Sequence, residues 1–147
     1  MNPTFQKDTV YQLMKAAKLL RNRLDAALRE HDITSSQFSV LNIIHQSNTQ
    51  PTSSEIAYIL SSDRPTISGI LLRLEQKGMI IRSENPLDRR EEKISLTEKS
   101  QSDMSSVINK TDQIGEEVER LIKGSEQKDF NQILFNMIET FEKDDIK

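Results

Sequence analysis

Apolar residues recur at helical spacing over most of the chain, and a short alternating pattern interrupts this spacing after its middle. Residues three and four positions apart share one face of a helix, so each such stretch predicts an amphipathic helix. The first runs from about Asp8 to His31. The expected helix starts along the chain are Asp8, Thr34, Thr52, Arg64, Thr97 and Ser125. The sequence therefore predicts a mostly α fold.

Two Thr-x-x-Gln/Glu motifs mark helix starts in the first half of the chain. Thr34 stands three positions before Gln37, and Thr52 stands three positions before Glu55. In such a capping box the hydroxyl accepts from the third amide, and the long side chain reaches back to the N–H of the first residue. The two helices are expected to bury Phe38, Leu41, Ile44, Ile56, Ile59 and Leu60.

Residues 61–63, Ser-Ser-Asp, form the expected turn into a helix with two different faces. The apolar face carries Ile67, Ile70, Leu71 and Leu74. The first turn presents small polar and cationic side chains, namely Arg64, Pro65, Thr66 and Ser68. Side chains of this kind can enter a DNA major groove while the apolar face packs on a core. The pattern predicts a helix-turn-helix with a recognition helix.

A β-hairpin is predicted after this helix, so that residues 63–97 form a recognition helix and a wing. Gly78 can end the helix in a left-handed conformation. The strand and turn signals that follow are Met79-Ile80-Ile81, Asn85-Pro86-Leu87-Asp88 and Lys93-Ile94-Ser95-Leu96. The tip then holds Asp88, Arg89 and Arg90. Guanidinium groups suit the negative potential of a narrow minor groove, and Asp88 can hold one of them in a bidentate pair.

The length of 147 residues predicts one compact domain with three segments. Residues 1–33 and 98–147 are expected to be dimerisation helices, and residues 34–97 the winged DNA-binding lobe. The last helix carries an apolar stripe that a monomer of this size would struggle to cover. Broad apolar faces at both ends of the chain favour a homodimer.

Several functional classes are disfavoured by what the sequence lacks. It has no cysteine, and His31 and His45 are not clustered with carboxylates, so neither a metal site nor another cofactor is expected. We find no glycine-rich phosphate loop and no nucleophile with a base, so an enzyme is not expected. No apolar run approaches the ~18 residues of a membrane span, and no signal segment is present. We therefore expect a cytoplasmic protein with no membrane partner.

The net charge of -3 argues mildly against a nucleic-acid partner, but the charges are unevenly distributed. From Asp63 to Lys93, seven basic residues face six acidic ones, a balance of +1. The remaining 13 basic and 17 acidic residues give -4. The positions of the basic residues in this central segment are therefore better evidence for the kind of partner than the net charge of the chain. Among them, Arg82 is expected only to neutralise its neighbours.

Together, these motifs resemble the MarR (multiple antibiotic resistance) family of bacterial winged-helix regulators. The matching motifs are Thr34-x-x-Gln37, Ser54-Glu55-Ile56-Ala57, Leu74-Glu75-x-Lys77-Gly78, Asp88-x-Arg90 and Leu96-Thr97. The resemblance implies a homodimer whose terminal helices interleave and whose two winged lobes straddle a pseudopalindromic operator on double-stranded DNA. It also implies repression that a small aromatic or anionic effector relieves, with effector-binding residues that remain unknown.

The resemblance assigns expected roles to individual residues. It implies that Thr66 and Ser68 touch bases or phosphates, that Arg73 contacts the DNA backbone or braces the helix, and that Arg90 enters the minor groove. Asp88 corresponds to the residue that orients this arginine. The chain departs from the family pattern at Gly69, Leu72 and Ser100. These departures bear on the sequence of the operator more than on its class.

Plainer interpretations stay open for each of these residues. Polar residues at a helix start, such as Arg64 and Thr66, can serve only as helix caps, and Arg89 and Arg90 can belong to a solvated turn. Thr52, Ser53 and Ser54 could donate to a phosphate at a helix N-terminus, yet capping explains them equally. Two other functions are considered: a winged-helix adaptor that binds proteins rather than DNA, and a PadR-like regulator.

Overall fold

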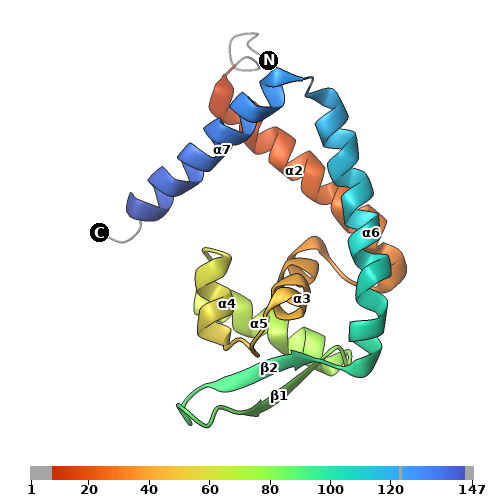
Figure 1. Ribbon diagram of the computed structural model, residues 1–147, viewed down its shortest axis with the longest axis vertical. Coiled ribbons are helices and arrows are strands. Elements are labelled where there is room, and N and C mark those ends of the chain that lie inside the picture. Colours follow the sequence, from red (N-terminus) through yellow and green to blue (C-terminus); the bar gives the residue numbers. More distant parts are fainter. Residues whose placement is uncertain (1–7, 123, 145–147) are drawn as a thin grey trace. The chain divides into compact units, whose positions relative to one another are not determined.

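The computed structural model describes residues 8–122 and 124–144 (Figure 1). The described elements are α2 (Thr9–Leu28), η1 (Arg29–His31), α3 (Ser35–Gln46), α4 (Ser53–Ile59), α5 (Arg64–Gln76), β1 (Ile80–Glu84), β2 (Glu92–Leu96), α6 (Glu98–Leu121) and α7 (Ser125–Asp144). The predicted fold class, a mostly α winged helix-turn-helix with a small hairpin, is confirmed. No helix in the described part of the chain is long and apolar enough to span a membrane.

The chain consists of two compact units, Met1–Thr111 and Asp112–Lys147, and the boundary between them lies within α6. The first contains α2, the helix-turn-helix, the hairpin and the start of α6. The second contains the rest of α6 together with α7. The segments expected from the sequence are defined by role, namely dimerisation or DNA binding, and not by compactness. The segments 1–33, 34–97 and 98–147 therefore stay a prediction. Their residues 1–7, 123 and 145–147 lie outside the described residues.

The predicted capping boxes start α3 and α4. The Gln37 amide donates to Thr34 Oγ1 over 3.2 Å, and the Thr34 amide donates to Gln37 Oε1 over 3.1 Å. The Glu55 amide donates to Thr52 Oγ1 over 3.2 Å, and the Thr52 amide donates to Glu55 Oε2 over 2.7 Å. The bond from the Thr52 amide lowers the pKa of Glu55. Each box satisfies helix donors that would otherwise lack a partner, which explains these helix starts.

The end of α5 sets the direction in which the chain enters the hairpin. Gly78 has a φ of 67°, in the left-handed region that glycine adopts without penalty. Its amide donates to the Glu75 carbonyl over 2.9 Å, and the Met79 amide donates to the Leu74 carbonyl over 2.9 Å. This pair of bonds is a Schellman motif, which ends a helix and turns the chain. The predicted role of Gly78 is confirmed.

The hairpin pairs β1 and β2 antiparallel, with Ile80 opposite Leu96 and Glu84 opposite Glu92. Ile80 and Ile94 are buried while Ile81 is exposed, as expected when alternate side chains point to opposite faces of a strand. The Ile94 amide also donates to the Pro51 carbonyl over 2.9 Å, which joins β2 to the segment before α4. The predicted wing is therefore attached to the helix-turn-helix through its return strand.

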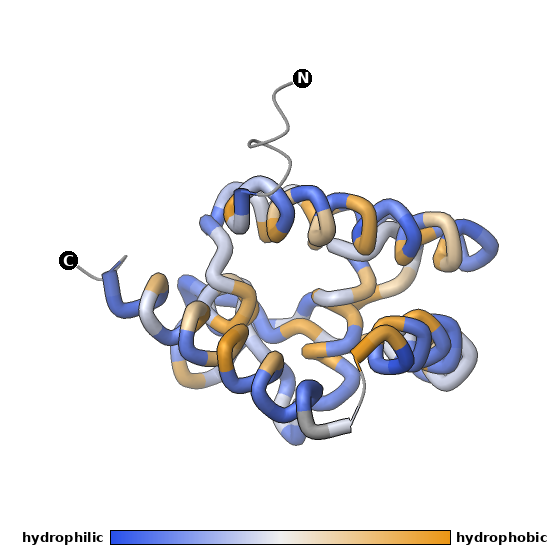
Figure 2. Tube along the Cα trace, turned by 90° about the horizontal axis from the view of Figure 1, so that it is seen from above, coloured by the Kyte–Doolittle hydropathy of each residue, from blue (hydrophilic) through white to orange (hydrophobic). Residues whose placement is uncertain are grey.

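A core of aliphatic side chains lies between α2, α3, α4, α5, the hairpin and the start of α6 in the first unit. Its fully buried members include Leu28, Val40, Ile56, Ile67, Leu71, Leu74, Ile94 and Met104. Along the helices, hydrophobic positions are interleaved with hydrophilic ones (Figure 2). In α3, α4 and α5 this arrangement leaves one apolar face for the core and one polar face for solvent.

The expected burial of α4 is wrong at one residue. Leu41, Ile44 and Ile56 are buried, and Phe38 and Leu60 pack partly against the core, but Ile59 is 56% exposed. The inward face of this short helix is centred on Ile56, Ala57 and Leu60. Successive residues are about 100° apart around a helix, so Ile59 lies at the edge of this inward face. The spacing of apolar residues alone did not determine which neighbours of Ile56 share the inward face of the helix.

Leu71→Ala is expected to lower the free energy of unfolding by about 2–5 kcal/mol, because the side chain is fully buried and its removal leaves a cavity. Leu72→Ala, at the adjacent and half-exposed position, is the matched control and should cost less than about 1 kcal/mol. Urea unfolding followed by circular dichroism, at equal protein concentrations, measures both values. Equal losses in the two variants would contradict the packing of α5 described above.

Candidate nucleic-acid interface

The start of α5 is fixed by its N-cap residue, Asp63. The Thr66 amide donates to Asp63 Oδ1 over 2.8 Å, and the Thr66 hydroxyl donates to Asp63 Oδ2 over 2.7 Å. Both bonds lower the pKa of Asp63, and the bond from the Thr66 hydroxyl has the larger effect. Pro65 stands in the first turn, where its missing N–H removes no intrahelical bond. The predicted recognition helix thus begins with a defined geometry.

The two faces of α5 differ as the sequence predicts. Ile67, Ile70, Leu71 and Leu74 are buried. The side chains proposed to meet DNA are exposed, namely Arg64, Pro65, Thr66, Ser68 and Arg73. Leu72 adds one half-exposed apolar side chain to α5, and nothing lies within 4 Å of a Cβ built on Gly69. The exposed surface of α5 can therefore approach another molecule without disturbing the core.

The wing tip holds a fixed guanidinium group. Arg90 Nε donates to Asp88 Oδ1 over 3.1 Å, and Arg90 Nη2 donates to Asp88 Oδ2 over 3.2 Å. The Arg90 amide also donates to Asp88 Oδ1, over 3.0 Å. The side-chain bonds lower the pKa of Asp88 and raise the pKa of Arg90. Asp88 therefore lies where the sequence expects an orienting partner.

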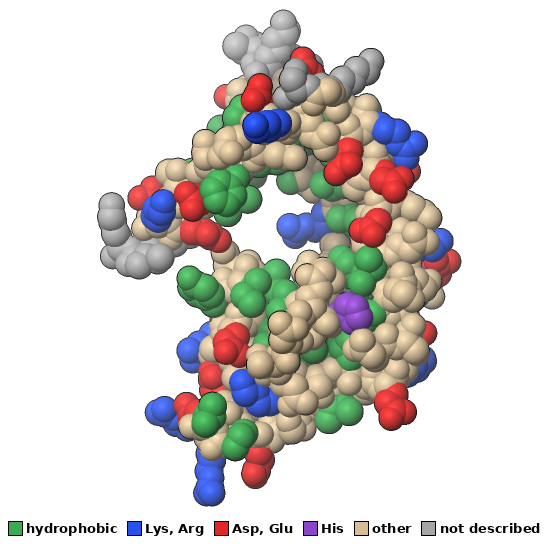
Figure 3. Space-filling view, viewed as in Figure 1, with side chains coloured by type: hydrophobic (Ala, Val, Ile, Leu, Met, Phe, Trp, Pro, Cys, Tyr) green, Lys and Arg blue, Asp and Glu red, His purple; other side chains and the backbone are tan. Residues whose placement is uncertain are grey.

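The pairing leaves the guanidinium open to a further partner, because the Arg90 side chain stays 89% exposed. Arg89 is exposed beside it. Figure 3 shows Lys and Arg side chains at the end of the wing, next to hydrophobic ones. A cation that is exposed and already oriented can meet a phosphate or a groove with little loss of side-chain entropy.

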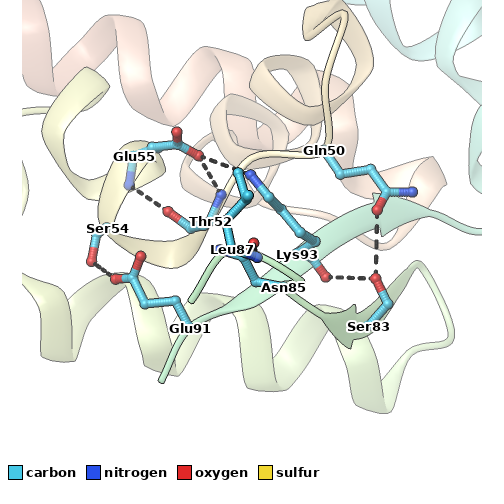
Figure 4. A network of polar contacts seen from close by, with 9 residues as sticks. All are labelled: Gln50, Thr52, Ser54, Glu55, Ser83, Asn85, Leu87, Glu91 and Lys93. Carbon is cyan, nitrogen blue, oxygen red and sulfur yellow. Dashed lines mark hydrogen bonds and ion pairs between the residues drawn. The ribbon is translucent and has the colours of Figure 1, made fainter. Parts of the chain in front are cut away.

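The base of the wing is tied to the helix-turn-helix by side chains (Figure 4). Ser54 of α4 donates its hydroxyl to the Glu91 carboxylate. Lys93 Nζ lies 4.0 Å from Glu55 Oε2 of α4. Buried Asn85 accepts from the Leu87 amide over 3.1 Å and so holds the turn that leads to the tip. The contacts of Ser54 with Glu91 and of Glu55 with Lys93 join segments that are far apart in the sequence.

Arg82 forms a second connection, between the hairpin and α5. Its Nε lies 3.2 Å from Glu75 Oε2 of α5, and its Nη1 lies 3.5 Å from Glu92 Oε2 of β2. The sequence assigns Arg82 only the neutralising of neighbours, and the structure adds that these neighbours belong to two different elements. The partners of Arg82 and Ser54 follow from no local motif, since Ser54 and Glu91 are 37 residues apart.

The three residues predicted at the start of α4 differ in their surroundings. Thr52 is only 4% exposed and its hydroxyl serves the capping box, so the capping interpretation suits it better than a phosphate contact. The Ser54 hydroxyl is engaged with Glu91. Ser53 is the first residue of α4 and is half-buried. Thr52 is therefore not part of the proposed interface.

The described part of the first unit also has an open cavity of about 400 Å³ beside η1 and the start of α6. Its walls combine apolar side chains with two lysines and three carboxylates, namely Leu41, Met79, Met104, Lys77, Lys99, Glu30, Asp32 and Asp103. Lys77 donates to the Asp32 carbonyl oxygen and lies 3.4 Å from the Asp32 carboxylate. A cavity of this kind can accommodate a small molecule that has an apolar part and a polar part.

Comparison with known proteins identifies the fold of the chain and the family that its central segment matches. Residues 33–91, which include the helix-turn-helix and most of the wing, match the model of the MarR family. The segment 33–91 is therefore a MarR-family domain. The predicted resemblance is thereby confirmed.

Solved structures match this chain over nearly its whole length. The MepR–DNA complex of S. aureus is 22% identical, covers 90% of this chain and 98% of its own, and has a TM-score of 0.86. The transcriptional repressor CouR bound to a 23-mer DNA duplex is 24% identical over 96% of each chain, with a TM-score of 0.77. CouR from Rhodococcus jostii RHA1 bound to p-coumaroyl-CoA is 20% identical, over 90% and 91% of the two chains, with a TM-score of 0.76.

Arg90→Ala is expected to raise the pKa of Asp88 toward its ordinary value of about 3.9, because the lowering is due mainly to the Arg90 side chain. A folded-state pKa below the unfolded value means that the pair stabilises the fold above the ordinary pKa and loses this effect as the pH falls through the lowered one. Carboxyl carbon NMR titration measures the change. Arg89→Ala is the matched control and should leave the pKa of Asp88 in place; equal effects of the two variants would contradict the assigned pairing.

Proposed function

We propose that this chain is a dimeric, sequence-specific DNA-binding transcriptional regulator that acts as a repressor. The observation that carries the proposal is the pairing of two features on one lobe. The first is the exposed polar start of α5, and the second is Arg90, held by Asp88 at the tip of the wing. The similar folds of MepR and CouR, each solved with DNA, support the proposal.

In this proposal α5 lies in a major groove. Arg64 and Ser68 can donate hydrogen bonds to base edges or phosphates. The Thr66 hydroxyl already donates to Asp63, so toward DNA it offers its acceptor lone pairs and its methyl group. These suit a base amino group or a thymine methyl. Arg73, farther along α5, would contact the DNA backbone. Gly69 has no side chain, so one base would lack a direct contact at this position.

The wing arginines would enter the minor groove beside each major-groove contact. Arg90 is the principal candidate because Asp88 orients it, while Arg89 has the same charge and exposure. A narrow minor groove concentrates negative potential and favours an arginine. Ser53, at the N-terminus of α4, is the remaining candidate for a phosphate contact there.

A homodimer would supply the second recognition helix. Both terminal helices carry exposed apolar side chains, including Met14 and Leu19 of α2 and Ile133, Ile138 and Phe141 of α7. Burial of such side chains against a second copy is favourable because it removes apolar surface from water. A two-fold dimer would bind a pseudopalindrome with half-sites about 10 base pairs apart.

A small-molecule effector would release the repressor from DNA. The structure of CouR with p-coumaroyl-CoA supports an aromatic, anionic class of ligand for this fold. In this chain the cavity beside η1 has an apolar wall and two lysines, and one of its three carboxylates, Asp32, already pairs with Lys77. We infer an effector of that chemistry for this cavity. The proposed function involves no enzymatic step.

Arg90→Ala is expected to weaken operator binding by about 1–3 kcal/mol and to reduce the salt slope of log K by about one unit, because one cation leaves the DNA. The operator is first obtained by sequencing genomic fragments that the purified protein retains. Fluorescence anisotropy at several salt concentrations then compares the variants. Lys143→Ala, which removes a cation from α7, is the control and should change neither value.

The same experiment tests the alternative of a winged-helix adaptor that binds proteins, which the net charge of -3 and Gly69 favour. An adaptor would retain no specific fragment and would respond weakly to salt. A parent protein that retains no pseudopalindrome would overturn the proposed function. A parent that binds with unchanged affinity after Arg90→Ala would overturn the assignment of the wing.

Ile138→Asp is expected to shift the protein from dimer to monomer at micromolar concentration, because a carboxylate in an apolar interface loses its hydration. Sedimentation velocity measures the change. Asn131→Asp, which adds the same charge at a polar position of α7, is the matched control and should stay dimeric. Dimers in both variants would contradict the role proposed for α7.

A further inference from the structure

Glu91 directly follows the two wing arginines and contacts a different element of the lobe. Its carboxylate accepts the hydroxyl proton of Ser54, in the first turn of α4. Both residues are half-buried, so solvent does not fully surround the bond. Figure 4 shows Glu91 and Ser54 reaching toward each other from the hairpin and from α4. A carboxylate beside a surface meant for DNA therefore has a partner inside the protein.

Arg90 depends on this neighbourhood for its direction. The bonds described for its side chain go to Asp88, which belongs to the same turn. The Asp88 pair fixes Arg90 relative to the turn but does not fix the turn relative to α5. The first bond after Arg90 that leads from the wing to a helix of the lobe is the one between Glu91 and Ser54. Glu91 is thus the contact nearest to Arg90 among those that attach the wing to the lobe.

The next two residues support the same connection. Glu92 pairs with Arg82, which also pairs with Glu75 of α5. Lys93 lies 4.0 Å from Glu55 of α4. The three consecutive residues after the arginines therefore contact side chains of α4 or of β1, and among these contacts α5 is reached only through Arg82.

We propose that Glu91 is a positioning residue, which holds Arg90 at the distance from α5 that lets both reach DNA at once. This inference rests on the proposed function. It also changes the role of Ser54. A serine hydroxyl can donate one hydrogen bond, and in this structure Ser54 donates it to Glu91. Ser54 therefore acts as the anchor of the wing instead of a phosphate donor.

The charge of Glu91 makes the proposal testable. A carboxylate near DNA repels phosphates, so its removal alone should strengthen binding. Loss of the anchor should weaken binding, because Arg90 would then have to be ordered when DNA binds. Glu91→Gln removes the charge but keeps an oxygen that can accept from Ser54, whereas Glu91→Ala removes both. The two substitutions separate repulsion from positioning.

The experiment compares the Kd of these two variants for the selected operator, by fluorescence anisotropy at several salt concentrations. Glu91→Gln should bind at least as tightly as the parent, and Glu91→Ala about 10-fold more weakly than Glu91→Gln, a typical size for coupled neighbours. The matched control is the pair Glu84→Gln and Glu84→Ala, at an exposed acidic residue on the other strand. Its two members should bind alike.

Two further variants show whether Glu91 acts through the predicted partners. Glu91→Ala should add little to the loss already caused by Arg90→Ala, and Ser54→Ala should weaken binding without adding to Glu91→Ala. Thermal unfolding of each variant separates a loss of binding from a loss of fold, and Ser54→Ala tests the anchor independently if Glu91→Ala does not fold.

Equal affinities of Glu91→Gln and Glu91→Ala would overturn the proposal, because repulsion alone would then explain the residue. Additive losses from Ser54→Ala and Glu91→Ala would overturn it as well, since Ser54 would then contact DNA independently. A parent protein that binds no operator would instead overturn the proposed function, and that outcome is visible before any Glu91 variant is measured.

Discussion

The burial of one face of α5 is the constraint on which the rest of the lobe depends. Ile67, Ile70, Leu71 and Leu74 pack into the core shared by the helices and the hairpin. Burial of these side chains fixes the rotation of α5, because each fully buried aliphatic residue contributes about 1.5–3 kcal/mol. With the rotation fixed, the polar side chains of the first turn must face outward. The surface proposed for DNA is thus a consequence of packing on the opposite side.

The wing depends on the same core through its strands. Ile80 and Ile94 are buried with α5, so the register of the hairpin follows from which residues alternate inward. The turn can then hold Arg90 outside the core while Asp88 orients it. Side-chain contacts from Glu91 and Arg82 connect this turn to α4 and α5. Packing positions the wing, and polar contacts set its direction.

The distribution of charge explains how a chain with net charge -3 can carry a surface suited to DNA. Several acidic residues of the lobe are engaged with partners within it: Asp63 caps α5, Asp88 pairs with Arg90, and Glu75 and Glu92 pair with Arg82. The arginine at the tip remains exposed despite its pair. Net charge is therefore a weaker guide to the partner than the position of each charge.

The sequence by itself determined the features that depend on neighbours in the chain. The two capping boxes, the end of α5 at Gly78, the hairpin and the proximity of Asp88 to Arg90 all involve residues within a few positions of each other. Propensity and turn geometry act at that range, so residue types and spacing suffice to predict them.

Only the tertiary structure decided the exposure of Ile59, the burial of Thr52 and the contacts of Ser54 and Arg82. The first two depend on how a two-turn helix is rotated against the core, and its few apolar residues fit more than one rotation. The others join residues that lie far apart in the chain or on separate elements. No local pattern encodes such pairs, because they form only when packing brings the elements together.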